Sequence, residues 1–234
     1  MYLKMNWETE IYDDWFNGID EANKIPDSKT MRKWFMGGED IDIEMKERYS
    51  ILTDIYVPEY NNVVELYSML NEPIESIESN LFNWKKRFLG RIILGDQIFR
   101  HIYRGNKHAY IWERTNRNAV MNLMLKLQWN VEKVWSIFNP CEILFLLLPL
   151  VHYEPRRDNN IQYSISSNTY YEINKVLNFW KESLDLVKSL VMNNKDDIIK
   201  YTDFINKAIR NVRRHYEELK MNDGRYSSRD TMYS

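Results

Sequence analysis

The sequence is poor in the residues that form turns and cross-links. Its 234 residues include only 7 glycines, 6 prolines and one cysteine. All-β chains and Rossmann-type chains need many tight turns, so this scarcity argues against both and favours long helices. The single cysteine, Cys141, excludes an internal disulfide and predicts a reducing, cytoplasmic location.

Long hydrophobic runs are also lacking. The most apolar stretch is ILFLLLPLV, residues 143–151. It is much shorter than the roughly 20 residues that cross a bilayer. It also contains a proline, so we expect a core helix here and no membrane partner. The opening residues MYLKMNWETE hold no apolar core of signal-peptide length.

The chain has no excess of positive charge, because its net charge is −2 at pH 7. A protein that binds nucleic acid over a broad face must neutralise many phosphates, so we expect no nucleic-acid partner. The composition is 44% hydrophobic and 28% charged, which is typical of a folded globular protein. A chain of this length can bury a sizeable core.

Helix-breaking residues divide the sequence into an all-α pattern with no convincing strand. A short first element, 7–16, precedes about eight helices, and residues 132–138 read as a turn. The predicted helices are 28–35, 41–56, 60–70, 79–104, 108–128, 141–151, 161–192 and 196–220. Short loops predict stacked antiparallel helical hairpins in one domain, residues 1–221, followed by a flexible polar tail, 222–234, without core positions.

Two of these helices carry clear start signals. Asp40 is the predicted N-cap of helix 41–56. The sequence Asn-Pro-Cys-Glu, residues 139–142, combines an N-cap asparagine, a proline at the first position and a glutamate at the third. The helix that it opens is apolar on nearly all sides and should be central. Its proline, Pro149, should kink or end it.

Charged residues interrupt the apolar segment RIILGDQIFRHIYRG, residues 91–105. On one helix, Asp96, Arg100 and Arg104 would share a face. Gln97 lies beside them, and Tyr103 follows Arg100 by three residues. One interpretation is a structural hub in which Asp96 pairs with Arg100. The other is an anion site, because one acid cannot neutralise two arginines.

A second polar group follows the central helix in PLVHYEPRR, residues 149–157. Histidine, here His152, has an ordinary pKa near neutral pH, and Glu154 supplies a carboxylate that can orient such an imidazole. Because residues two apart point in different directions on a helix, both can meet one partner only if a neighbouring proline bends the chain. We expect no metal, since no further His or Cys stands at ligand spacing, and no cofactor, since no phosphate-binding glycine loop appears.

Four stretches resemble motifs of the mostly bacterial family called domain of unknown function 924. They are IYDDWF, KWFMGGEDIDIEMKERY, IILGDQIFRHIYRGNKHAYIWE and FLLLPLVHYE. The third is similar to the family's L-L-D-Q-F-P-R-N-x-x-R-G-x-x-x-A-F-x-x-D signature, and the fourth to F-x-Y-L-P-x-x-H-S-E. The resemblance implies an all-helical fold of the tetratricopeptide-like class and a single site joining the two polar groups. It supplies no activity. The residues on its motif positions are Asp96, Gln97, Arg100, Arg104, Gly105, His152 and Glu154.

The chain departs from the family pattern at several positions. At position 99 phenylalanine replaces the motif proline, and at position 101 histidine replaces the asparagine. At position 153 tyrosine replaces the serine. Glu113 stands where aspartate is usual. The family's closing F-G-R-F-P-x-R-N signature has its nearest counterpart in YTDFINKAIRN, residues 201–211, which lacks the proline and one arginine. A divergent or inactive site is implied.

These observations leave three functions open. The first is a pocket that binds an anionic small molecule or an acidic peptide. The second is an enzyme in which His152, oriented by Glu154 or Asp96, acts as general acid or base. The third is a scaffold that binds partner segments. The residues expected to contact the ligand are Arg100, Arg104, Gln97, Tyr103 and Glu113.

Overall fold

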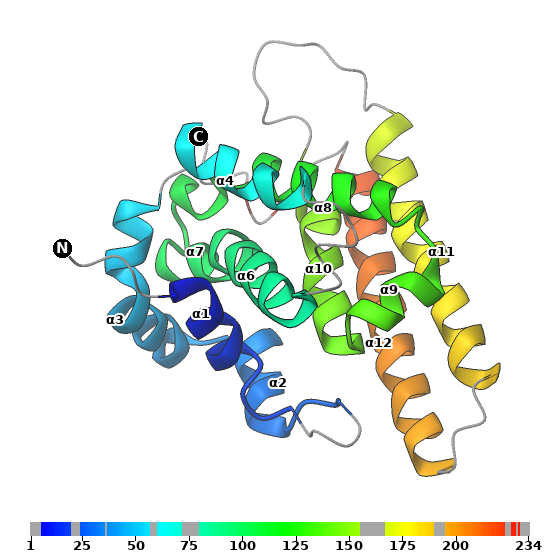
Figure 1. Ribbon diagram of the computed structural model, residues 1–234. Coiled ribbons are helices and arrows are strands. Elements are labelled where there is room, and N and C mark those ends of the chain that lie inside the picture. Colours follow the sequence, from blue (N-terminus) through cyan, green and yellow to red (C-terminus); the bar gives the residue numbers. More distant parts are fainter. Residues whose placement is uncertain are drawn as a thin grey trace.

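The computed structural model describes residues 6–19, 24–35, 37–56, 60–71, 80–154, 167–189, 195–222, 226, 227 and 229. These residues form about ten packed helices and no strand (Figure 1), which confirms the all-α prediction. Stacking as tetratricopeptide-like hairpins stays a prediction. The helices are α1 (Trp7–Trp15), α2 (Ser28–Phe35), α3 (Glu39–Ile55), α4 (Tyr60–Asn71), α6 (Leu81–Ile93), α7 (Phe99–Ile102), α8 (Glu113–Lys126), α9 (Val131–Ile137), α10 (Pro140–His152), α11 (Ser167–Ser189) and α12 (Lys195–Met221).

Helix α10 forms the centre of the fold and begins as the sequence predicts. The Asn139 side chain accepts a hydrogen bond from the Glu142 backbone at 3.0 Å, and Glu142 Oε2 accepts one from the Asn139 backbone at 2.8 Å. This reciprocal capping satisfies two donors at the helix start. The helix is buried from Pro140 to Val151. It packs against α6, α8, α9, α11 and α12, so any side chain at its end lies among several helices.

The first three helices and the last two lie on opposite sides of this central helix. Helices α1, α2 and α3 lie on one side of the molecule, whereas α11 and α12 form a long antiparallel pair on the other (Figure 1). Helix α1 approaches α6 closely at Gly90, where an added Cβ would lie 2.0 Å from the Glu8 carbonyl oxygen. Glycine is therefore required at this crossing, because any side chain would push the two helices apart.

Several predicted helix bounds are wrong. The expected helix 79–104 is divided by a π-helical turn, Leu94–Ile98, and ends at Ile102. The expected helix 108–128 begins as a 3₁₀ turn, Lys107–Tyr110, before α8. Residues 132–138 are largely helical as α9, because the Asn130 side chain caps that segment by accepting from the Lys133 backbone at 2.8 Å. Gly38, and not Asp40, is the N-cap of α3.

The prediction of a tail without core positions is wrong at two residues. Tyr226 is 4% exposed and Arg229 is 5% exposed. The Tyr226 hydroxyl donates to the carbonyl of Val151 at the end of α10. The ring and the guanidinium thus find partners on the helical body, which a pattern of hydrophobic residues cannot reveal. Most other residues of the segment 222–234 lie outside the described part of the chain.

No single helix in the described ranges is both long and apolar enough to cross a membrane. The bent pair formed by α9 and α10, which meet at 117°, meets that criterion together by length and composition alone.

Candidate functional site

The first component of the site is the π-helical turn between α6 and α7. This wider turn carries Asp96 and Gln97, which are 1% and 8% exposed. A π turn of this kind inserts extra backbone into a helix and is frequent at functional sites. Here it aims a carboxylate and an amide into the protein, toward the end of α10.

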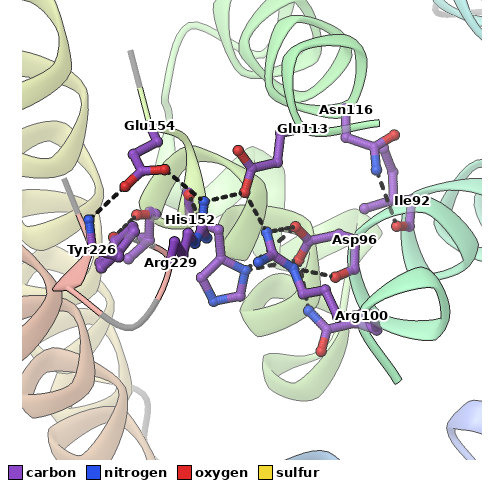
Figure 2. Close-up of polar contacts among 11 residues, drawn as sticks. Ile92, Asp96, Arg100, Glu113, Asn116, His152, Glu154, Tyr226 and Arg229 are labelled. Carbon is purple, nitrogen blue, oxygen red and sulfur yellow. Dashed lines mark hydrogen bonds and ion pairs between the residues drawn. The ribbon is translucent and has the colours of Figure 1, made fainter. Parts of the chain in front are cut away.

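Asp96 receives hydrogen bonds from three side chains, as Figure 2 shows for His152 and Arg100. Its Oδ2 lies 3.0 Å from His152 Nδ1 and 2.6 Å from Gln97 Nε2, and its Oδ1 lies 3.1 Å from Arg100 Nη2. Burial alone would raise the pKa of Asp96, but the charges of His152 and Arg100 hold it well below its ordinary value. Asp96 is therefore an ionised hydrogen-bond acceptor.

His152 is the last residue of α10 and lies at the edge of the site, with its side chain 16% exposed. Because the Asp96 carboxylate can only accept, Nδ1 of the imidazole carries a proton. Burial lowers the pKa of His152 against the opposing charge of Asp96. No hydrogen bond joins the second nitrogen, Nε2, to a side chain drawn in Figure 2. A neutral imidazole held in this way keeps a lone pair on Nε2.

A chain of ion pairs extends from Arg100 across the site (Figure 2). Glu113 Oε1 lies 2.8 Å from Arg100 Nη2 and 2.7 Å from Arg229 Nη1. The same Nη1 lies 3.4 Å from Glu154 Oε2, and Glu154 Oε1 accepts from the Tyr226 backbone at 2.5 Å. Arg229 Nη2 also donates to the carbonyl oxygen of His152 at 3.1 Å. Glu154 thus serves the C-terminal segment and has no described contact with the His152 ring.

This cluster has no excess of positive charge among its described residues, contrary to the expected cationic excess. Among the described residues, three carboxylates (Asp96, Glu113 and Glu154) face two guanidinium groups, Arg100 and Arg229, and a neutral imidazole of His152 adds no charge. The expected surplus of charge on Arg100 and Arg104 is absent, because Glu113 also pairs with Arg100 and Asp42 pairs with Arg104. The structure therefore assembles the two polar groups of the sequence into one network, without a surplus of positive charge among its described members.

Two expected ligand residues lie outside the cluster. Arg104 has a side chain that is 57% exposed, and its Nη2 lies 2.8 Å from Asp42 Oδ1. The Tyr103 hydroxyl lies 3.3 Å from Thr53 Oγ1. The π turn shifts the helical register, and α7 ends at Ile102, so the spacing of Arg104 no longer places it on the face of Asp96. Of the expected residues, Asp96, Gln97, Arg100, Glu113, His152 and Glu154 do join the network.

Arg104 instead lines an open hollow of about 570 Å³. Its neighbour His101 places Nδ1 2.7 Å from Asp42 Oδ1. Burial lowers the pKa of His101 despite that contact. The residues that line the hollow are Gly38, Glu39, Asp42, Ile43, Lys46, His101, Ile102 and Arg104.

The described residues offer no obvious metal or thiol chemistry. Within them, no three His, Cys, Asp or Glu side chains gather to hold a metal ion. Cys141 is fully buried at the start of α10, and burial raises the pKa of its thiol. A protonated, enclosed thiol is a poor nucleophile, so Cys141 acts as a small core residue.

Tyr226 and Arg229 are the site residues that sequence reasoning missed. The segment GRYSSRD, residues 224–230, matches the closing F-G-R-F-P-x-R-N signature at its glycine and both arginines, with tyrosine in place of the second phenylalanine. This segment, and not residues 201–211, is the counterpart of the signature. The sequence match to the signature is weak in this segment, because serine replaces the proline and aspartate replaces the final asparagine.

The comparison with known protein families covers nearly the whole chain. The family model described as "Bacterial protein of unknown function (DUF924)" matches residues 11–232, which include both motif helices and the C-terminal segment. No curated protein and no solved structure matches this chain. By the extent of that match, the chain belongs to the DUF924 family.

Proposed function

We propose that this protein is an acid–base enzyme in which His152 exchanges a proton with a substrate through Nε2. The observation that carries the proposal is the 3.0 Å contact between His152 Nδ1 and the buried carboxylate of Asp96. A carboxylate at this position fixes the tautomer and the orientation of an imidazole, and it stabilises the imidazolium that forms when Nε2 takes a proton.

The surroundings of the pair suit this role. Arg100 and Gln97 hold Asp96 in place, so the carboxylate does not need to reorganise during a reaction. The lowered pKa of His152 favours the neutral imidazole at pH 7, which is the form that acts as a base. The side chain of His152 is 16% exposed, whereas Glu154 is only 4% exposed and is occupied by Tyr226 and Arg229.

An anion-binding pocket has less support, because its premise was an excess of positive charge. Arg100 and Arg229 are both engaged by carboxylates within the described cluster. A ligand anion would have to compete with Asp96, Glu113 and Glu154 for these two cations. The alternative of a docking scaffold has no specific contact in its favour among the described residues.

A substrate screen tests the proposal. Purified protein is assayed with chromogenic esters, amides, phosphate esters and glycosides, beside His152→Gln and the control His108→Gln, whose histidine is exposed. Turnover from this site should fall by about 10²–10⁴-fold in His152→Gln and stay unchanged in His108→Gln. The rate should rise with pH as His152 loses its proton.

The dyad can also be tested without a substrate. Nitrogen chemical shifts of the labelled imidazole report which ring nitrogen carries the proton. We expect His152 to be protonated on Nδ1 at pH 7 in the wild-type protein, and to lose this preference in Asp96→Asn. A ring protonated on Nε2 alone, or turnover that survives His152→Gln, would refute the assignment.

A further inference from the structure

The guanidinium of Arg229 lies in an enclosure built largely by the helical body. Nη1 contacts Glu113 at 2.7 Å and Glu154 at 3.4 Å, and Nη2 donates to the His152 carbonyl at 3.1 Å. The guanidinium carbon lies 4.2 Å from the centre of the Tyr110 ring. We infer that Glu113, Glu154, Tyr110 and the His152 carbonyl form a guanidinium-binding site, which Arg229 of the same chain fills.

The chemistry of the enclosure matches a planar cation on both its edge and its face. The two carboxylates and the carbonyl accept from the edge, where guanidinium carries its N–H donors. Tyr110 covers a face from the body, and Tyr226 adds a second ring at 4.7 Å from the C-terminal segment itself. A lysine ammonium has neither the fork nor the flat face, so this arrangement selects guanidinium.

Arg229 behaves as a ligand that the chain carries to this site. It follows the end of α12 at Met221, and it contacts residues 75 and 116 positions earlier in the sequence. If Arg229 left, the acceptors that it contacts on Glu113, Glu154 and the His152 carbonyl would remain in place at the same edge. Two of them are buried carboxylates, so the vacated site should favour a guanidinium over an uncharged molecule of the same shape.

The class of ligand that fits this site is therefore a guanidinium group. The side chain of an arginine in a peptide is one example. It borders the His152–Asp96 pair through the His152 backbone, but the inference does not depend on catalysis by that pair. Binding of guanidinium and turnover at His152 are separate measurements, so either proposal can fail alone.

Chemical rescue of Arg229→Ala tests the inference. This change removes the resident cation and leaves space for a free guanidinium ion. Thermal unfolding is followed at millimolar guanidinium chloride, far below denaturing concentrations, with ionic strength held constant by NaCl. We expect the melting temperature of the variant to rise with the logarithm of the guanidinium concentration, by about 3–5 °C at ten times the dissociation constant.

Four controls make the result specific. Urea has the same planar shape without charge, and ammonium has the charge without the shape, so neither should stabilise Arg229→Ala. The matched variant Arg213→Ala removes an exposed arginine of α12 and should gain nothing from guanidinium. The wild-type protein, whose site is filled, should likewise gain nothing.

Two outcomes would overturn the inference. One is a variant Arg229→Ala that guanidinium stabilises no more than urea or ammonium does. If Arg229→Ala does not fold, circular dichroism at 222 nm is recorded with each additive, and recovery of helix with guanidinium alone is expected. Equal recovery with all three additives, or none with any, would be the second contrary outcome. Arg229→Lys, which keeps the charge, should respond less than Arg229→Ala.

Discussion

His152 Nδ1 lies 3.0 Å from Asp96 Oδ2, although 56 residues separate them in the sequence. The contact joins the end of the central helix α10 to the π turn that follows α6. The contact therefore links the stability of the helical core to the geometry of the candidate site. Substitution of either residue should change the free energy of unfolding as well as the activity.

Removal of the Asp96 charge should destabilise the fold strongly. Asp96→Asn leaves Arg100 with one carboxylate fewer in a buried setting, so the free energy of unfolding should fall by about 3–5 kcal/mol. Urea denaturation measures the change. Asp40→Asn is the control, because Asp40 and its partner Arg32 are both more than half exposed, and it should cause no resolvable loss. Equal effects of the two substitutions would contradict a buried ionised Asp96.

His215 should make the protein sensitive to acid. Burial, followed by the charge of His152, lowers the pKa of His215 to about 3, against about 6.5 in an unfolded chain. Between these values the unfolded state binds one more proton, so the contribution of His215 to stability is present above pH 6.5 and falls with pH, by up to about 1.4 kcal/mol per pH unit.

Urea denaturation at pH 7, 6, 5 and 4 checks this dependence. His215→Gln removes the titrating group, so its stability should decline less steeply than that of the wild type. His108→Gln serves as the control and should retain the wild-type slope. An unchanged slope in His215→Gln would show that other groups cause the acid sensitivity.

The C-terminal segment should contribute to stability through Tyr226. Tyr226→Phe removes the hydroxyl that donates to the Val151 carbonyl and should cost about 1–2 kcal/mol, because a buried acceptor loses its partner. Tyr226→Ala also empties the space of the ring and should cost about 3–5 kcal/mol. Tyr171→Phe, at a site 58% exposed, is the control. A loosely attached tail would instead make both Tyr226 changes neutral in chemical denaturation.

The crossing of α1 and α6 should not tolerate a side chain at Gly90. The new Cβ of Gly90→Ala would lie 2.0 Å from the Glu8 carbonyl oxygen, which is backbone and cannot rotate away. We expect a loss of about 1–3 kcal/mol from this overpacking, although alanine is the better helix former. Asn83→Ala, on the exposed side of the same helix, should have little effect. A more stable Gly90→Ala would mean that the two helices separate easily.

The sequence predicted the fold class and the central helix because those depend on local signals. Few turn residues, an uninterrupted apolar segment and the Asn139 capping box each act within a few residues, and the structure contains each feature. The meeting of Asp96, Arg100 and His152 was also expected, although the resemblance to a family was needed to join the two groups.

The remaining residues of the site could not be placed by counting along a regular helix. The π turn at Leu94–Ile98 adds backbone between Asp96 and Arg104, so counting in steps of four placed Arg104 on the wrong face. Arg229 was missed for a different reason. A buried arginine in a polar segment is indistinguishable by composition from a solvated one until its carboxylate partners, Glu113 and Glu154, are known in space.

The residues of the ion-pair network are synthesised at different times. Asp96, Arg100, Glu113 and Glu154 leave the ribosome first, and Arg229 follows Glu154 by 75 residues. During that interval the nascent helices can pack around α10, but Glu154 has yet to meet its C-terminal partners. The cluster therefore cannot close before Arg229 has been synthesised, and a chaperone or ligand that supplies a cation in this interval would meet Glu113 and Glu154 before their own arginine does.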